Sequence, residues 1–278
     1  MFGNKNVAFI ATGGAGRGIS HIGVLKALEE YGVSLDMTIG ASAGAIVTMF
    51  YNQYGNTDLL VDHFRPFWKR QHKCKKFGWS KLFSFKNFLN SSIASGIFDL
   101  SGAEKFLKDS LVTDNFNEVP IPSYVSVTNI TKSEGVLIGP GQSDVNISRA
   151  LVASCCLPIL FRPVKIGDDY YMDGEIKRPL SLEAAINLGA EVVIISDMYK
   201  YSNLSDLRMI SVASKVANML LEDKTVRGIR YCATKYPEVE IILISPDASK
   251  FSIANTWSYS ELIDAGYNAA TEVLEKRG

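Results

Sequence analysis

Short apolar runs alternate with longer amphipathic stretches along this chain of 278 residues. The short runs predict strands, at 6–11, 36–41, 124–130, 135–139, 191–196 and 240–245. The last two runs are continuously apolar, which is typical of strands covered on both faces. The longer stretches predict helices, at 21–32, 42–55, 179–189, 205–235 and 258–276. Segment 164–174 predicts a hairpin. We expect a single α/β domain over residues 1–278, with a mostly parallel sheet between helical layers.

Composition narrows the class of protein without naming a function. Hydrophobic residues make up 47% of the chain and charged residues 21%, and the formal net charge is zero, so the chain as a whole is not built to coat nucleic acid. The apolar run near the N-terminus is shorter than a signal peptide or a membrane span. The four cysteines (Cys74, Cys155, Cys156, Cys232) have no C-x-x-C spacing. We therefore expect reduced thiols in a cytoplasmic protein, although an effector exported without a cleaved signal would have the same pattern.

The stretch "TIGASAGAI" places a serine among very small residues. Ser42 is flanked by Gly40 and Gly44, with alanines between. Helix interiors disfavour glycine and buried strands favour branched side chains, so the composition indicates a sharp strand-to-helix turn. In the G-x-S-x-G nucleophile elbow such a turn exposes a serine hydroxyl above the end of a sheet. A tight turn whose serine caps the next helix is the alternative.

The glycine-rich loop "GGAGRG" at 13–18 follows the first predicted strand and leads into a helix. The glycine spacing does not fit a dinucleotide fingerprint, and Gly18 lacks the following lysine of a P-loop. Exposed backbone N–H groups at a helix start are suited to negative charge and can form an oxyanion hole. A structural turn remains the alternative.

The base that would activate Ser42 is not an obvious histidine. The chain contains only His21, His63 and His72, whereas elbow hydrolases have the order Ser, acid, His. A carboxylate at a strand end is the substitute, and Asp173 fits because it follows "YYM" and precedes Gly174, which permits a tight turn. A simple Asp-Gly turn is the other interpretation.

Four segments in order, "GGAGRGISHIGVLKALEE", "GASAG", "SRALVASCCLPILFRPV" and "YYMDG", resemble the patatin-like phospholipases over about residues 5–200. The resemblance implies a three-layer α/β/α sandwich and a Ser–Asp dyad without histidine. It implies Ser42 as the nucleophile and Asp173 as the base. It also places Arg17 at the arginine of the glycine-rich motif, and the oxyanion hole at Gly13, Gly14 and Ala15.

Two residues depart from the family pattern. Ala15 replaces a third glycine, and its methyl is costly if the local φ is positive. Glu175 replaces a small residue after Asp-Gly, so that a second carboxylate lies near Asp173 and could alter its ionisation or narrow the pocket. The adjacent Cys155 and Cys156 are interpreted as packing residues rather than nucleophiles.

A basic aromatic segment spans about residues 63–98, with no acidic residue. Its eight cations are Arg65, Lys69, Arg70, Lys73, Lys75, Lys76, Lys81 and Lys86, and aromatic rings are interleaved among them. We expect a cap near the active site that contacts anionic membrane, with Trp68 and Trp79 inserting. Single-stranded nucleic acid and a plain solvated face over core rings are the alternatives, and nucleic acid is not the expected partner.

The sequence therefore predicts a cytoplasmic lipid acyl hydrolase that can bind peripherally to the membrane and acts on phospholipid, lysophospholipid or other fatty-acyl esters. No cofactor is expected, and no cluster has metal-ligand spacing. A lipid-binding or regulatory protein that has lost turnover and an acyltransferase are the alternatives. Headgroup, chain length and oligomeric state have no signal in the sequence.

Overall fold

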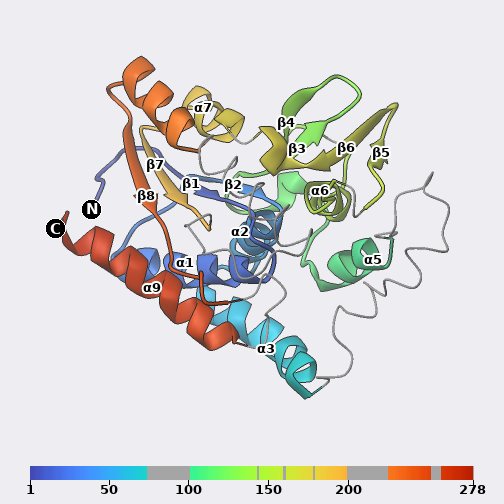
Figure 1. The fold of residues 1–278 in the computed structure, drawn as a ribbon, viewed down its shortest axis with the longest axis horizontal. Coiled ribbons are helices and arrows are strands. Elements are labelled where there is room, and N and C mark those ends of the chain that lie inside the picture. Colours follow the sequence, from blue (N-terminus) through green and yellow to red (C-terminus); the bar gives the residue numbers. More distant parts are fainter. Residues whose placement is uncertain are drawn as a thin grey trace, which may run out of the picture.

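The computed structural model describes residues 1–73, 101–142, 144–158, 161–177, 179–198, 225–251 and 258–277. Within these residues eight strands form one sheet, in the order β5-β6-β3-β2-β1-β7-β8, with β4 also paired to β3 (Figure 1). The strands are β1 (Val7–Ala11), β2 (Met37–Ala41), β3 (Ser123–Asn129), β4 (Glu134–Ile138), β5 (Val164–Ile166), β6 (Asp169–Asp173), β7 (Val192–Ser196) and β8 (Glu240–Ile244).

The centre of the sheet is parallel, because β3, β2, β1, β7 and β8 pair in that sense. The β5–β6 hairpin and β4 pair antiparallel at the other side. Parallel strands bring their carboxyl ends to one edge, so the loops that follow β1 and β2 lie together there.

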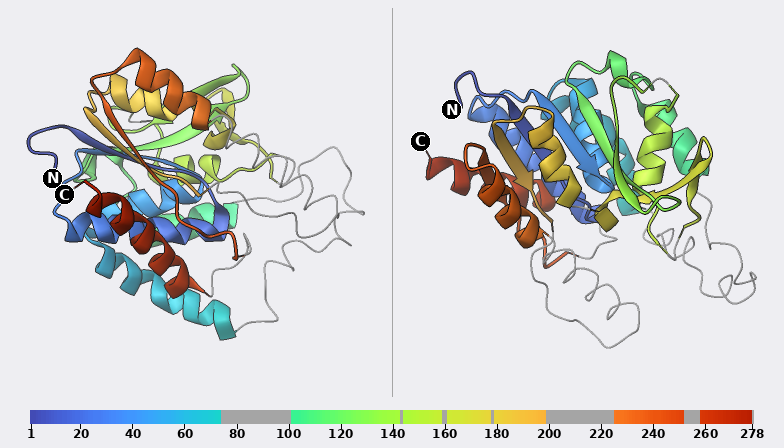
Figure 2. Two further views of the ribbon diagram at one scale, coloured as in Figure 1. Left: turned by 60° about the vertical axis from the view of Figure 1, so that its left-hand side comes forward. Right: turned by 90° about the horizontal axis from the view of Figure 1, so that it is seen from above.

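Helices cover both faces of the sheet, which confirms the predicted three-layer α/β/α sandwich (Figures 1 and 2). One face carries α1 (Ser20–Glu30), α2 (Ala43–Tyr54), α3 (Thr57–Lys73), α6 (Ile147–Ser154) and α9 (Tyr259–Glu275). The opposite face carries α7 (Pro179–Asn187) and the helical residues 225–235. Helix α5 (Ser101–Ser110) lies against α6.

Helices α1 and α9 pack with their backbones in close contact. A Cβ atom on Gly23 would overlap the carbonyl oxygen of Ile263, and one on Gly266 would overlap that of Ser20. Only glycine permits this approach at either position. The last helix of the chain is thereby held against the helix that follows the glycine-rich loop.

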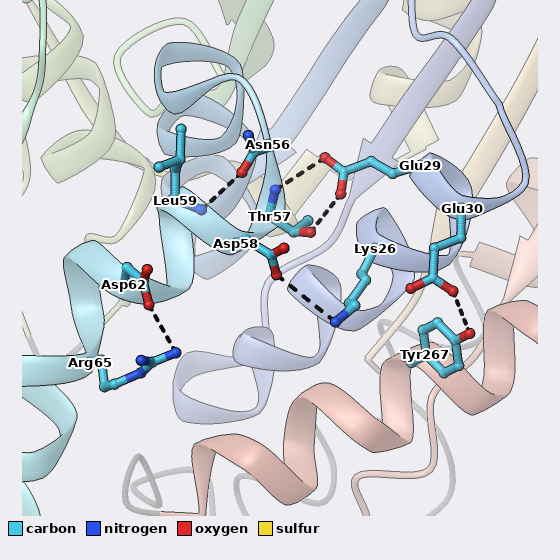
Figure 3. Close-up of polar contacts among 10 residues, drawn as sticks. All are labelled: Lys26, Glu29, Glu30, Asn56, Thr57, Asp58, Leu59, Asp62, Arg65 and Tyr267. Atoms are coloured by element: carbon cyan, nitrogen blue, oxygen red, sulfur yellow. Dashed lines mark hydrogen bonds and ion pairs between the residues drawn. The ribbon is translucent and has the colours of Figure 1, made fainter.

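Helix α3 begins at a junction with α1 (Figure 3). The Asn56 side chain accepts a hydrogen bond from Leu59 N at 2.9 Å, as an N-cap residue does. Glu29 of α1 accepts from both the backbone N (3.0 Å) and the hydroxyl (2.5 Å) of Thr57, so a negative charge meets the positive end of α3. This junction fixes where α3 leaves the body of the domain.

The predicted strands are confirmed, and one detail of burial was wrong. Strand β7 is buried throughout, but β8 lies at the edge of the described sheet, and its Leu243 is 40% exposed. The continuous apolar run therefore predicted the strand β8 correctly, but not how far its two faces are covered. The part of the predicted 205–235 helix before residue 225 lies outside the described residues.

Candidate active site

Ser42 occupies a strained turn between β2 and α2. Its backbone has φ 51° and ψ −124°, a conformation that non-glycine residues rarely adopt. The flanking glycines are needed for space: a Cβ on Gly40 would overlap Ala45, and one on Gly44 would overlap the carbonyl of Ala11. The turn thus has the geometry of a nucleophile elbow, with Ser42 8% exposed.

Ser154 at the end of α6 supports this turn. Its hydroxyl accepts a hydrogen bond from Ser42 N at 2.8 Å and donates one to the carbonyl of Ser126 at 2.7 Å. The bond gives the buried Ser42 amide a hydrogen-bond partner, because in the strained turn this amide takes part in neither the strand nor the helix pattern. Sequence reasoning missed Ser154. The residue lies inside a family motif, but a serine in an apolar helix has no pattern that indicates such a contact.

Asp173 ends β6 and reaches the same edge of the sheet as Ser42. Ala41 pairs with Ser126 of β3, and the next residue of β3, Val127, pairs with Asp173. Thr128 donates a hydrogen bond to the Asp173 carbonyl at 2.9 Å, which fixes the strand end. Gly174 is required there, because a Cβ would overlap the Ser126 carbonyl. The structure therefore brings the two predicted dyad residues together.

The Asp173 carboxyl is 1% exposed, and burial raises its pKa to about 7. The negative charge of Glu175 adds to the rise, whereas a hydrogen bond from Glu175 N to Oδ1 (2.9 Å) and the nearby Ser42 side chain oppose it. Oδ2 makes no aligned hydrogen bond with the residues that the structure describes, so Ser42 approaches Asp173 without a well-formed bond. Bonds between catalytic groups often tighten only around substrate.

The glycine-rich loop follows β1 and leads into the 3-10 helix Ala15–Ile19. Ala15 has φ 49°, in the left-handed region, so the departure from glycine carries the backbone cost that a positive φ implies. Gly14 has φ 162° and ψ 6°, and a Cβ there would press on the Met198 side chain at 2.9 Å. Arg17 donates through Nε to the Phe251 carbonyl at 2.7 Å, which orders the loop against the C-terminal part of the chain.

One amide of the predicted oxyanion loop is already engaged. Gly13 N donates a hydrogen bond of 2.6 Å to Oε1 of Glu175, whose side chain is 5% exposed. His21 lies beneath the loop, and its Nε2 donates to the carbonyl of Thr12 at 2.7 Å while Nδ1 pairs with the Ser196 hydroxyl. That histidine is a structural residue of the core.

The two adjacent cysteines are not activated thiols. Burial raises the pKa of both Cys155 and Cys156 to about 12, and the charge of Asp173 adds to the rise. The Cys156 thiol donates to the Arg162 carbonyl at 2.8 Å. Both therefore remain protonated at neutral pH, although Cys155 lies beside Ser42.

The basic aromatic segment is described only up to residue 73, where α3 ends. The expectation that Trp68 inserts into a membrane was wrong: its side chain is 5% exposed and stacks on Tyr259 with centroids 4.7 Å apart. Trp79 and the cations from Lys75 onward lie outside the described residues. No helix of the described chain is long and apolar enough to span a bilayer.

The described part of the molecule contains a small cavity and a larger hollow. A cavity of about 30 Å³ on the α7 face is lined mainly by aliphatic side chains of β1, β2, β7 and α7, and by Glu175. A larger hollow of about 440 Å³ opens between α1, α3 and α9, and its lining contains neither Ser42 nor Asp173. Among the described residues no three His, Cys, Asp or Glu side chains are placed to bind a metal ion.

The chain is similar in sequence to proteins named as lysophospholipases. Lysophospholipase nte1 of Aspergillus fumigatus is 27% identical over 195 residues, which are 70% of this chain and 12% of that protein. Lysophospholipase NTE1 of Debaryomyces hansenii is 27% identical over 198 residues, 71% of this chain and again 12% of the relative. This chain therefore matches only a small part of the length of these relatives.

Among solved structures, VipD from Legionella pneumophila is 14% identical, with a TM-score of 0.45 over 98% of this chain and 67% of that chain. A sequence model of the patatin-like phospholipases matches residues 11–186, more than half of the chain and including the elbow, the glycine-rich loop and Asp173. The chain belongs to the patatin-like phospholipase family.

Proposed function

We propose that this protein is a serine lipid acyl hydrolase that cleaves carboxylic esters of phospholipids, lysophospholipids or similar amphiphiles. The observation that carries the proposal is the pairing of a strained, buried Ser42 with a buried carboxyl, Asp173, at one edge of the sheet. Family membership and relatives named as lysophospholipases support the same class of substrate.

In the proposed reaction the Ser42 hydroxyl attacks the acyl carbonyl and Asp173 accepts its proton. A carboxyl with a pKa raised to about 7 is a stronger base at neutral pH than an ordinary aspartate. Backbone N–H groups of the glycine-rich loop stabilise the oxyanion. Collapse of the tetrahedral intermediate expels the alcohol, which takes the proton from Asp173. Water then attacks the acyl-enzyme and gives its proton to Asp173, and this proton passes to the Ser42 oxygen as the fatty acid leaves.

The direct test is labelling with a fluorophosphonate, followed by mass spectrometry to locate the adduct. We expect the adduct on Ser42, and we expect Ser42→Ala to lose both labelling and hydrolysis of a p-nitrophenyl ester while the circular dichroism spectrum stays unchanged. Ser133→Ala is the matched control, because Ser133 also has a positive φ but lies in the β3–β4 turn. A Ser42→Ala protein with full esterase activity would refute the dyad.

A folded wild-type protein that binds lipid but neither labels nor hydrolyses would favour the binding-protein alternative. The backbone strain at Ala15 and the engagement of Gly13 by Glu175 are the observations in favour of that alternative. Transfer to an acceptor other than water would appear as ester turnover that depends on an added alcohol or lysolipid.

We further propose that the basic segment docks the enzyme on anionic membrane. Each exposed cation near such a surface contributes about 1 kcal/mol, and salt screens the attraction. Replacing Lys73, Lys75 and Lys76 with glutamine should weaken co-sedimentation with phosphatidylserine vesicles at low salt and leave hydrolysis of a short-chain ester unchanged. Unaltered vesicle binding would assign these lysines to a solvated face.

A further inference from the structure

Glu175 lies across the strand end that carries Ser42. The strands run in the order β6, β3, β2, β1, and Glu175 follows β6 while Gly13 follows β1. Strand β2, which leads into Ser42, lies between them. The 2.6 Å hydrogen bond from Gly13 N to Glu175 Oε1 therefore passes over the elbow strand.

The same residue also contacts the proposed base. Glu175 N donates to Asp173 Oδ1 at 2.9 Å, and both side chains are buried. The main chain of Glu175 orients the carboxyl of Asp173, and its side chain holds the first amide of the glycine-rich loop. One residue thus connects the two halves of the site, which lie on either side of the nucleophile.

We propose that Glu175 is a positioning residue that holds the glycine-rich loop and the Asp173 carboxyl in register across the Ser42 elbow. The inference rests on the proposed function, since it assigns Asp173 the role of base. Gly13 then serves as the anchor of the loop, and the N–H groups after it are left to the oxyanion.

The charge of Glu175 has a second effect on Asp173. Like charges disfavour joint ionisation, so Glu175 helps burial to raise the pKa of Asp173 to about 7. Among the described residues, other ionisable groups near the pair include the thiols of Cys155 and Cys156, Asp197, which accepts a hydrogen bond from Thr12, and His21, which donates to the Thr12 carbonyl. The residues that α7 and helix 225–235 contribute to the adjoining cavity, such as Ser181 and Thr225, are uncharged.

The test compares Glu175→Gln with Glu175→Ala in pH–rate profiles on a soluble ester. The glutamine keeps an oxygen that can accept from Gly13 N but lacks the charge, so its kcat at pH 8 should stay within about 3-fold of wild type while the acidic limb falls by about one pH unit. The alanine lacks the acceptor, so its kcat should fall roughly 10- to 100-fold at every pH. Glu183→Gln, a carboxylate of α7 paired with Lys235, is the control and should change neither quantity.

The inference would be overturned if the acidic limb of Glu175→Gln stayed where it is in wild type. Faster turnover in Glu175→Ala would also overturn it, because Glu175 would then hinder the reaction. A carbon NMR titration of the Asp173 carboxyl, assigned with Asp173→Asn, gives the same answer without turnover. We expect its midpoint to fall by about one pH unit in Glu175→Gln. Fluorophosphonate labelling of the wild type distinguishes failure of the proposed function from failure of the Glu175 inference. Absence of the Ser42 adduct refutes the proposed function, whereas an unshifted titration midpoint of Asp173 in Glu175→Gln refutes only the role of Glu175.

Discussion

Replacing Ala15 with glycine should leave the protein as stable as before or slightly more stable, which is unusual for an alanine in an ordered segment. The side chain is exposed and its φ is 49°. The methyl group therefore contributes little burial and forces an L-residue into the left-handed region.

The magnitude follows from two opposing costs. Alanine in the left-handed region costs about 1–2 kcal/mol relative to glycine. Glycine costs about 0.4–1 kcal/mol through the greater entropy of the unfolded chain. The difference predicts that Ala15→Gly raises the free energy of unfolding by about 0.5 kcal/mol.

Urea unfolding followed by circular dichroism measures the change, with Ala233→Gly as the matched control. Ala233 is also exposed but lies within helical residues 225–235, where the same substitution should cost about 1 kcal/mol. The two variants should therefore differ by about 1.5 kcal/mol. If Ala15→Gly destabilised the protein as much as Ala233→Gly, the loop would not be strained at Ala15.

Three further changes test the site and the packing of the fold. Asp173→Asn should melt at a higher temperature than wild type at pH 8 but not at pH 4, as melting curves at both pH values would measure. The reason is that wild type loses stability as pH rises from about 4, the pKa of Asp173 in the unfolded chain, to about 7, its pKa in the folded protein. Ser154→Ala should lower turnover about 10- to 100-fold by releasing Ser42 N. Ser148→Ala removes a partly buried hydrogen bond in the same helix and should lower only stability; assays of kcat and of melting on both variants check this. Gly23→Ala should destabilise the fold by roughly 3 kcal/mol in urea, because its Cβ meets the backbone of α9; a neutral result would contradict that contact.

The sequence was most informative where a local pattern determines structure. The apolar runs of β1 and β7 are buried strands, and the glycines around Ser42 are required by close backbone contacts. The edge position of β8 had no local signal, because its pattern matches that of a central strand. Leu243 is 40% exposed because the helical layer covers its face of β8 incompletely, and that coverage depends on the fold and not on the apolar run itself.

The contacts that shape the site could not be predicted for a different reason. The bond from Gly13 to Glu175 joins residues 162 positions apart, and its existence depends on the strand order rather than on either local sequence. The sequence did identify Glu175 as a departure that could alter Asp173 or narrow the pocket. Which atom its carboxylate meets required the fold.

The position of β1 has a consequence for how the protein is made. This N-terminal strand is paired on one side with β7, and Val7 pairs with Val192. During synthesis that side of β1 remains an unpaired edge until β7 has left the ribosome, and unpaired edges promote aggregation. Long-range parallel pairing is also slow to form. We therefore expect the yield of folded protein to depend on chaperones and on the rate of translation more than on substitutions at Ser42 or Asp173.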